Sequence, residues 1–206
     1  MPSSSDSLSR RERERRQRRR AMLEAAQSVF AERGYARATL DEVARRAEFG
    51  KGTLYNYFEA GKEGLLFAIF DEVYDDLRAM IRSTFGEGAP SGQSLRGAFH
   101  DLVVQSFTYY EEREDLFLIL IKEAHRLCFS DDPEKAAYFQ DQQRRTVGAL
   151  VPVVESAVDA GQIAALPPRP VAHMLLEVVN DMVVHRCLAE RGDDQGGSGP
   201  SDDGLL

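Results

Sequence analysis

The sequence predicts an all-α fold with two parts, a small N-terminal bundle of three helices and a larger C-terminal helical domain. Apolar residues recur at helical spacing almost throughout residues 20–191, and no stretch alternates for long enough to indicate a strand. Clusters of Gly, Pro and Asp interrupt this pattern, as is typical of helix ends. With 206 residues, 43% of them hydrophobic, the chain can bury a core for one large domain or two small ones.

The first predicted helix runs from an arginine cluster to about residue 33, where Gly34 ends it. Thr39 is a suitable N-cap for a short second helix, and Glu42 completes a capping box. A break at residues 48–50 precedes a third short helix, residues 51–58. Two short helices joined by a three-residue turn containing Gly predict a helix-turn-helix motif.

A long fourth helix is predicted over residues 62–85, and four more helices follow it. Their breaks fall at residues 86–92, near residues 114–115, and at residues 131–133 and 161–170. We therefore expect a basic, partly disordered N-terminal arm (1–19) and a helix-turn-helix DNA-binding domain (20–62). An effector-binding and dimerisation domain (63–191) and a disordered tail (192–206) complete the predicted organisation.

Charge is distributed unevenly along the chain. The net charge is −8, yet residues 1–60 carry 13 Arg and Lys against nine Asp and Glu, a balance of +4. The remaining residues have a balance of −12. This asymmetry indicates an anion-binding module joined to an acidic body. The acidic body would repel DNA and confine contact to residues 1–62.

Eight arginines lie within residues 10–20. They could form a solvated tail, a nuclear localisation signal, or an extension that follows a DNA operator. We favour the operator extension, with part of it becoming helical when DNA is bound. The arginines expected on phosphates or in a minor groove are Arg15, Arg16, Arg18 and Arg19.

The third predicted helix has a core face and a polar face. At 100° per residue, Leu54 and Phe58 point together toward the core. The opposite face is small and polar, and such a helix fits the major groove. Candidate contacts to bases and phosphates are Lys51, Gly52, Thr53, Tyr55, Asn56 and Tyr57, with Thr39 and Lys62 at neighbouring helix starts. The exposed tyrosines could instead serve packing or a protein contact.

Three segments carry a resemblance to the TetR/AcrR family of bacterial transcriptional regulators. They are Ala25-Ala26 with Val29-Phe30-Ala31-Glu32-Arg33-Gly34-Tyr35, Thr39-Leu40-Asp41-Glu42-Val43-Ala44, and Lys51-Gly52-Thr53-Leu54-Tyr55-Asn56-Tyr57-Phe58 with Lys62-Glu63. The resemblance covers about residues 20–70. It implies a homodimeric repressor, or less often an activator, that a small ligand releases from DNA. It also places Thr39, Lys51, Thr53, Tyr55, Tyr57 and Lys62 at operator-contact positions.

Three departures from the family pattern fall around the third helix. Glu48 stands where the family usually has the turn glycine, and Gly50 replaces a serine before the helix. The link at residues 59–61 is one residue longer than usual. These departures could change the orientation of the third helix on DNA and the phosphate contact expected of Lys62.

Aromatic residues on the middle helices predict either core packing or a pocket for a hydrophobic effector, since such pockets are mainly apolar with a few polar groups. The candidates for the pocket are Phe70, Tyr74, Phe99, Val103, Phe107, Phe117, His125 and Tyr138. On the last helix, apolar residues cover more than one face. This predicts a dimer interface built with the preceding helix, and hence a palindromic operator.

Other function classes find less support in the sequence. No nucleophile, P-loop or metalloprotease motif occurs, so we expect no enzyme and no cofactor. His125 and Cys128 could supply two metal ligands, as could His173 and Glu177, but zinc needs three or four, so we expect no metal site. A helical adaptor that does not bind DNA is the remaining alternative.

The expected compartment is the cytoplasm. The longest run of large apolar residues, residues 116–121, is far shorter than the roughly 20 that a membrane span requires. No signal peptide is visible, and the two cysteines, Cys128 and Cys187, suit a reducing environment.

Overall fold

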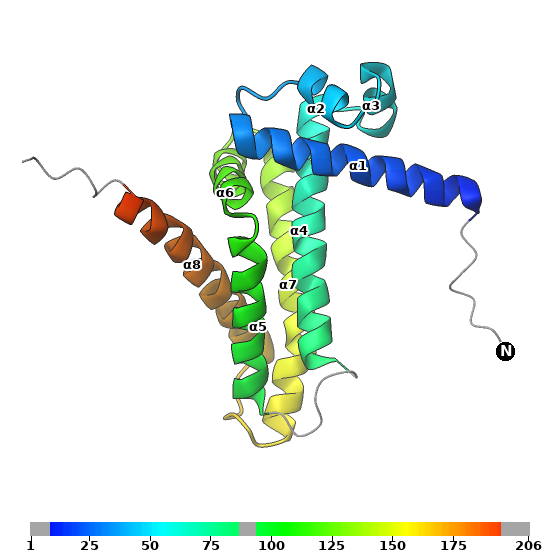
Figure 1. Cartoon of the computed structure of the whole chain (residues 1–206). Coiled ribbons are helices and arrows are strands. Elements are labelled where there is room, and N and C mark those ends of the chain that lie inside the picture. The colour runs from blue at the N-terminus through cyan, green and yellow to red at the C-terminus, as the bar shows by residue number, and fades with distance from the viewer. Residues whose placement is uncertain (1–8, 87–93, 195–206) are drawn as a thin grey trace, which may run out of the picture. The chain divides into compact units, whose positions relative to one another are not determined.

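The computed structural model describes residues 9–86 and 94–194, with side chains described as far as residue 185. Within these ranges every element is an α-helix (Figure 1). The helices are α1 (Arg10–Arg33), α2 (Leu40–Arg46), α3 (Lys51–Tyr57), α4 (Gly61–Phe85), α5 (Leu95–Glu111), α6 (Glu114–Cys128), α7 (Pro133–Asp159) and α8 (Pro168–Asp194). The predicted all-α fold, with its N-terminal helix-turn-helix and larger C-terminal helical domain, is confirmed.

The helix ends follow from local chemistry. Gly34 ends α1 with a φ of 74°, a conformation that costs glycine nothing. Asp132 caps α7 through its side chain, and Pro133 occupies the first turn, where a missing N–H is harmless. Helix α8 runs through Asp194, beyond the end predicted at residue 191. Residues 1–8 and 195–206 of the two predicted tails lie outside the described residues, as does the side chain of Cys187.

The chain divides into two compact units. The first comprises Met1–Asp75 with Asp115–Glu123, and the second comprises Asp76–Glu114 with Ala124–Leu206. In the first unit, α1 packs on α2 and α2 on α3. Its fully buried side chains include Met22, Leu23 and Phe30 of α1, Val43 of α2, Leu54 of α3 and Leu65, Leu66 and Ile69 of α4.

The second unit is a helical bundle around one apolar core. Helix α7 packs along α8, and α5 also contacts α8. The core consists of Leu77, Ile81, Leu102, Val147, Leu150, Val154, Ala172 and Leu176. In the described part of the chain, no helix is both long and apolar enough to cross a membrane.

Candidate nucleic-acid interface

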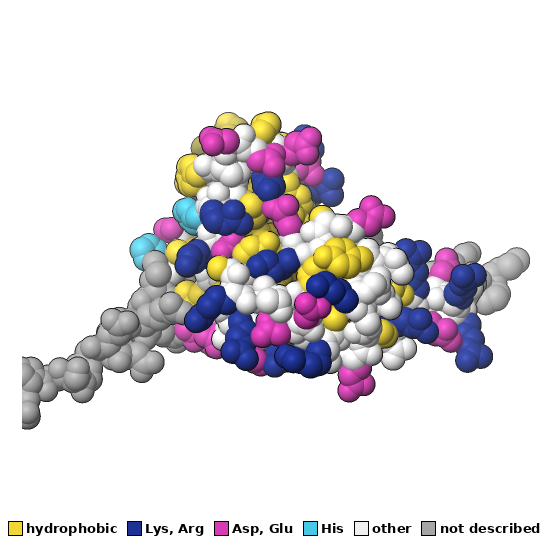
Figure 2. Space-filling model, turned by 90° about the horizontal axis from the view of Figure 1, so that it is seen from above, with side chains coloured by type: hydrophobic (Ala, Val, Ile, Leu, Met, Phe, Trp, Pro, Cys, Tyr) yellow, Lys and Arg dark blue, Asp and Glu magenta, His cyan; other side chains and the backbone are white. Residues whose placement is uncertain are grey.

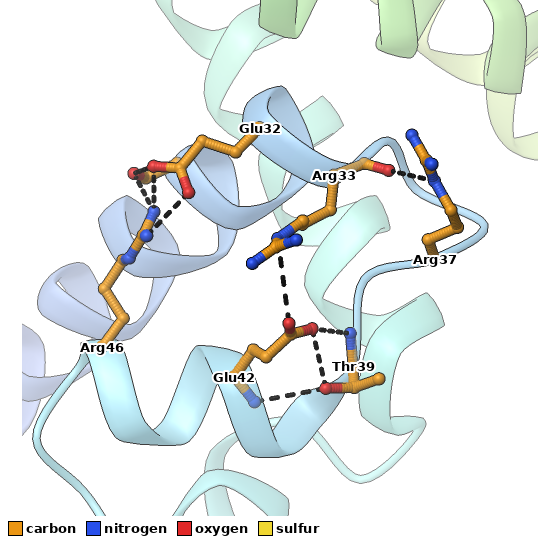
Figure 3. Close-up of polar contacts among 7 residues, drawn as sticks. Glu32, Arg33, Arg37, Thr39, Glu42 and Arg46 are labelled. Carbon is orange, nitrogen blue, oxygen red and sulfur yellow. Dashed lines mark hydrogen bonds and ion pairs between the residues drawn. The ribbon is translucent and has the colours of Figure 1, made fainter.

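Helix α2 begins with the predicted capping box. Thr39 Oγ1 accepts a hydrogen bond from the Glu42 backbone N–H at 3.3 Å, and the Thr39 N–H donates to Glu42 Oε2 at 3.1 Å (Figure 3). The Thr39 hydroxyl also donates to Glu42 Oε2, at 2.9 Å. These bonds stabilise the carboxylate and lower the pKa of Glu42. Thr39 therefore fixes the start of α2 and remains exposed there.

An arginine joins α2 to α1. Arg46 donates to both carboxylate oxygens of Glu32, at 2.5 and 2.7 Å, and to the Ser28 hydroxyl (Figure 3). The hydrogen bond from Arg46 lowers the pKa of Glu32. This bidentate geometry is the strong form of the arginine–carboxylate pair. It fixes the angle at which α2 leaves α1.

The turn between α2 and α3 is a Schellman motif. The Phe49 N–H donates to the Ala44 carbonyl at 2.9 Å, and the Glu48 N–H donates to the Arg45 carbonyl at 3.2 Å. Glu48 consequently has a φ of 59°, in the left-handed region that favours glycine. The family pattern has glycine here for this physical reason. Gly50 then begins α3 without a side-chain cap.

Helix α3 has the two faces that its sequence predicts. Leu54 and Phe58 are 1% and 5% exposed, so they anchor the helix in the core. On the other side, Lys51, Gly52, Tyr55 and Asn56 are exposed, whereas Thr53 and Tyr57 are half-buried. A side chain built on Gly52 would meet no atom within 4 Å. The backbone at Gly52 is thus open to a partner.

Lys51 is held at the start of α3. Its Nζ donates to Asp41 Oδ2 of α2 at 3.0 Å, and this bond raises the pKa of Lys51. The side chain keeps about half of its surface exposed, 48%. An ammonium group has three donors, so Lys51 can contact a phosphate while bound to Asp41.

Lys62, predicted to contact the operator, has its ammonium group bound within the protein. Its Nζ donates to the backbone carbonyls of Tyr35, Ala36 and Ala38, at 2.9, 3.3 and 3.1 Å, and lies 4.6 Å from the centre of the Tyr35 ring. All three ammonium donors are used inside the protein. This geometry gives no support to a phosphate contact by Lys62. Its side chain instead holds the loop that leads into α2.

The arginine cluster lies within α1, in agreement with the helix predicted to start there, and helix formation on DNA binding stays a prediction. Ser9 and Glu12 form a capping box at the start of α1. Arg10 pairs with Glu14 at 2.9 Å, one turn along the helix. The motif Ser-x-x-Glu at residues 9–12 is the signal in the sequence that predicts this helix start, and the helical spacing of apolar residues alone does not reveal it.

The eight effector candidates are divided between the two units. Phe70, Tyr74 and Phe117 belong to the first unit, and the other five belong to the second. Phe70 and Phe117 are buried, and Tyr74, Phe99, Val103, Phe107 and Tyr138 are half-buried. His125 is exposed and stacks on Phe129, which is 83% exposed. This surface position does not suit a polar group inside an apolar pocket.

A polar network in the second unit was not predicted. Arg78 Nη1 donates to Gln142 Oε1 at 2.9 Å and to Thr146 Oγ1 at 3.5 Å. Gln142 and Thr146 are buried at 4% and 0% exposure. Asp76, two residues before Arg78 on α4, accepts a 2.7 Å hydrogen bond from the Tyr109 hydroxyl. The pKa of Tyr109 is raised, mainly by burial and also by this hydrogen bond. The feature of the sequence that indicates this network is the pair of polar residues Gln142 and Thr146, which lie one turn apart within the apolar stripe of α7.

The described residues contain no cluster of three or more His, Cys, Asp or Glu side chains suited to a metal. Cys128 is a free, half-buried cysteine, and burial raises the pKa of its thiol. A raised pKa reduces the thiolate form that reacts with oxidants or metals.

Comparison with known proteins gives a consistent result. Residues 22–69 match the family described as bacterial regulatory proteins, tetR family. The chain is 26% identical to the uncharacterised transcriptional regulator YhgD of Bacillus subtilis over 78% of this chain and 80% of that protein. It is 28% identical to the transcriptional repressor KstR2 of Mycobacterium tuberculosis over 70% of this chain and 68% of the repressor.

Among solved structures, the transcriptional regulator FadR from Bacillus subtilis, crystallised in complex with stearoyl-CoA, has a similar fold. The TM-score is 0.69 at 18% identity, and the superposition covers 84% of this chain and 88% of that one. The similarity at this identity concerns the fold, which agrees with the helix order described above.

Proposed function

Because this chain belongs to the tetR family of bacterial regulatory proteins, we propose that it is a ligand-responsive repressor that binds a palindromic operator as a homodimer in the cytoplasm. The observation that carries the proposal is the exposed polar face of α3. It presents Lys51, Gly52, Tyr55 and Asn56 to a partner, while Leu54 fixes the opposite side in the core. A helix of this shape enters the major groove.

Each residue of this face has a chemical role in the proposal. Gly52 lets the backbone approach the base edges, because nothing projects from it. Asn56 and Tyr55 can donate and accept hydrogen bonds at base edges, and Lys51 neutralises a phosphate. Thr53 and Tyr57 lie at the margins of the face. Thr39 presents the start of α2 to the backbone, as helix N-termini do for anions.

An exposed apolar stripe on α8 supports the proposed dimer. Met174, Val178 and Met182 follow each other one helical turn apart and are 66%, 45% and 40% exposed. The buried side of the same helix carries Ala172, Leu176, Val179 and Val183. An apolar stripe left exposed on an otherwise packed helix is typical of a protein interface. We propose that it packs on a second copy, which sets two α3 helices about 34–36 Å apart.

The proposed effector site lies in the C-terminal domain. A neighbour in fold, FadR, is crystallised with stearoyl-CoA, which supports a hydrophobic effector for this chain as well. Phe99, Val103, Phe107 and Tyr138, all half-buried in the second unit, are the candidates that remain suitable. Binding there would bias α4, a single helix that runs through both units. A coupling of about 1–3 kcal/mol would release the operator 5- to 150-fold.

The decisive experiment is selection of bound sequences from a random double-stranded DNA pool at physiological salt. We expect an enriched palindrome for the wild type. Tyr55→Ala should lose the enrichment while keeping the helical circular dichroism and the dimer mass, because Tyr55 is exposed. Salt-sensitive binding without any enriched sequence would refute the proposed operator. Absence of DNA binding altogether would favour the helical adaptor.

A further inference from the structure

The first half of α1 and the end of α3 line an open groove in the first unit. It has a volume of about 710 Å³, with Asn56 and Tyr57 on one wall. The α1 wall carries Arg11, Arg15 and Arg18 together with Ser9, Glu12 and Glu14. Figure 2 shows Lys and Arg side chains gathered on this extension of α1, at the right of the view. We call residues 10–20 the arginine helix.

The face of α1 that is apolar and buried in the core carries arginines in the arginine helix. Met22 and Val29 are buried and lie seven residues apart on one face of α1. Continuing the same spacing toward the N-terminus gives Arg18, Arg15 and Arg11. The face that forms the core in the body of the domain is therefore cationic where it borders the groove.

Two arginines attach this helix to α3. The Arg15 guanidinium lies over the Tyr57 ring at 5.8 Å, and the Arg19 guanidinium lies over the Phe58 ring at 5.4 Å. The two contacts are one helical turn apart and join adjacent residues at the end of α3. Cation–π contacts at this distance are attractive. They orient the arginine helix relative to the proposed recognition helix.

Glu12 and Glu14 also line the groove, but their carboxylates are already hydrogen-bonded. Glu12 accepts from the Ser9 backbone at 2.8 Å, and Glu14 accepts from Arg10 at 2.9 Å. Arg11 and Arg18 have no ion-pair partner among the residues that the structure describes. Their guanidinium groups are exposed and suited to bidentate bonds with phosphate.

We propose that the arginine helix is a second DNA-binding element, which binds the phosphate backbone next to the base pairs contacted by α3. Arg11 and Arg18 contact phosphates, and Arg15 and Arg19 are positioning residues that hold the helix on α3. Arg16 is not among the residues that line the groove, and helical spacing places it on the outer face of α1. The proposal rests on the function proposed above. A helix of this length spans about 15 Å, equal to about four base pairs.

The test changes the helix while keeping its charge. Gln17 lies on the face of α1 opposite Arg15 and is exposed. Gln17→Pro keeps every arginine and interrupts the helix between residues 9–16 and the body, whereas Gln17→Ala is the matched control that keeps it. Hydroxyl-radical footprinting on the selected operator, and the dependence of affinity on salt, are measured for the wild type and both variants.

For the wild type and Gln17→Ala we expect protection of about four additional base pairs per half-site. Gln17→Pro should lose the outer part of this protection. It detaches Arg11, whereas Arg18 stays on the unbroken side of the helix, so each subunit neutralises one phosphate fewer and the log–log salt slope should fall by about 1.8 per dimer. An unchanged footprint and slope for Gln17→Pro would overturn the proposal, since a flexible charged chain would then suffice.

A second pair of variants separates the two faces without breaking the helix. Arg11→Gln with Arg18→Gln should reduce the slope by about 3.6 per dimer, because each subunit loses both phosphate contacts. Arg13→Gln with Arg16→Gln removes equal charge from the outer face and should reduce it by less. If both double variants reduced the salt slope equally, the proposal that the groove face contacts the phosphates would be wrong. If the wild type selects no palindrome, the proposed function fails, and these slopes measured on a 30-base-pair random duplex still decide this inference.

Discussion

Glu48 offers a direct test of how the turn before α3 is stabilised. Its φ of 59° costs a non-glycine residue about 1–2 kcal/mol. Glycine removes that strain but adds about 0.4–1 kcal/mol of freedom to the unfolded chain. Glu48→Gly should therefore stabilise the protein by about 0.5–1 kcal/mol. In a chain of this length, that raises Tm by about 1–4 °C in differential scanning calorimetry.

The end of α7 supplies the reciprocal experiment. The Gln162 N–H donates to the Ala157 carbonyl and the Gly161 N–H to the Val158 carbonyl, both at 2.9 Å, in the same Schellman pattern. Gly161 has a φ of 66°, and a side chain there would meet no atom within 4 Å. Gly161→Ala should thus lower Tm by an amount similar to the gain at Glu48, through backbone strain alone.

The control at Glu48 is alanine. Glu48→Ala removes the carboxylate and keeps the strained φ, so its Tm should stay within about 1 °C of the wild type. Should Glu48→Ala stabilise the protein as much as Glu48→Gly, the gain would come from the removal of the charge, and the conformational reasoning would be wrong.

Three further predictions concern Lys62, two glutamates and the α8 stripe. Lys62→Met should lower the free energy of unfolding in urea by about 1–2 kcal/mol, because three backbone carbonyls lose their donor. It should leave the salt slope of DNA binding unchanged, and a reduced slope would show that Lys62 does contact a phosphate. Hydrogen bonds lower the pKa of Glu32 and Glu42 in the folded chain, so their stabilisation is complete above the ordinary pKa of about 4.3 and is lost as pH falls through the folded values. The double Gln variant should lose less Tm between about pH 7 and pH 3 than the wild type, and an equal loss would contradict this. Val178→Glu should yield monomers in sedimentation velocity, with Glu177→Gln as the dimeric control; a Val178→Glu dimer would exclude this interface.

Local chemistry determines the parts of the structure that the sequence predicted. The Thr39–Glu42 capping box and the glycine end of α1 each depend on residues within one turn, so their patterns are visible in the sequence. The role of Lys62 depends on carbonyls 24 to 27 residues earlier, whose positions are set only once the loop before α2 has folded. The exposure of His125 was likewise decided by tertiary packing and not by the helical spacing of its segment.

The stability of α3 depends in part on its contacts with the arginine helix. A helix of seven residues is marginal by itself. Here it follows a residue in the left-handed region and begins without a side-chain cap, so its position depends on tertiary contacts. Those contacts are the buried Leu54 and Phe58, and the two guanidinium groups placed over Tyr57 and Phe58. Deleting residues 1–19 would therefore remove phosphate-binding charge and the support of α3 at once. Only variants that separate charge from helix geometry, such as Gln17→Pro against Gln17→Ala, can assign the loss of operator affinity to one cause.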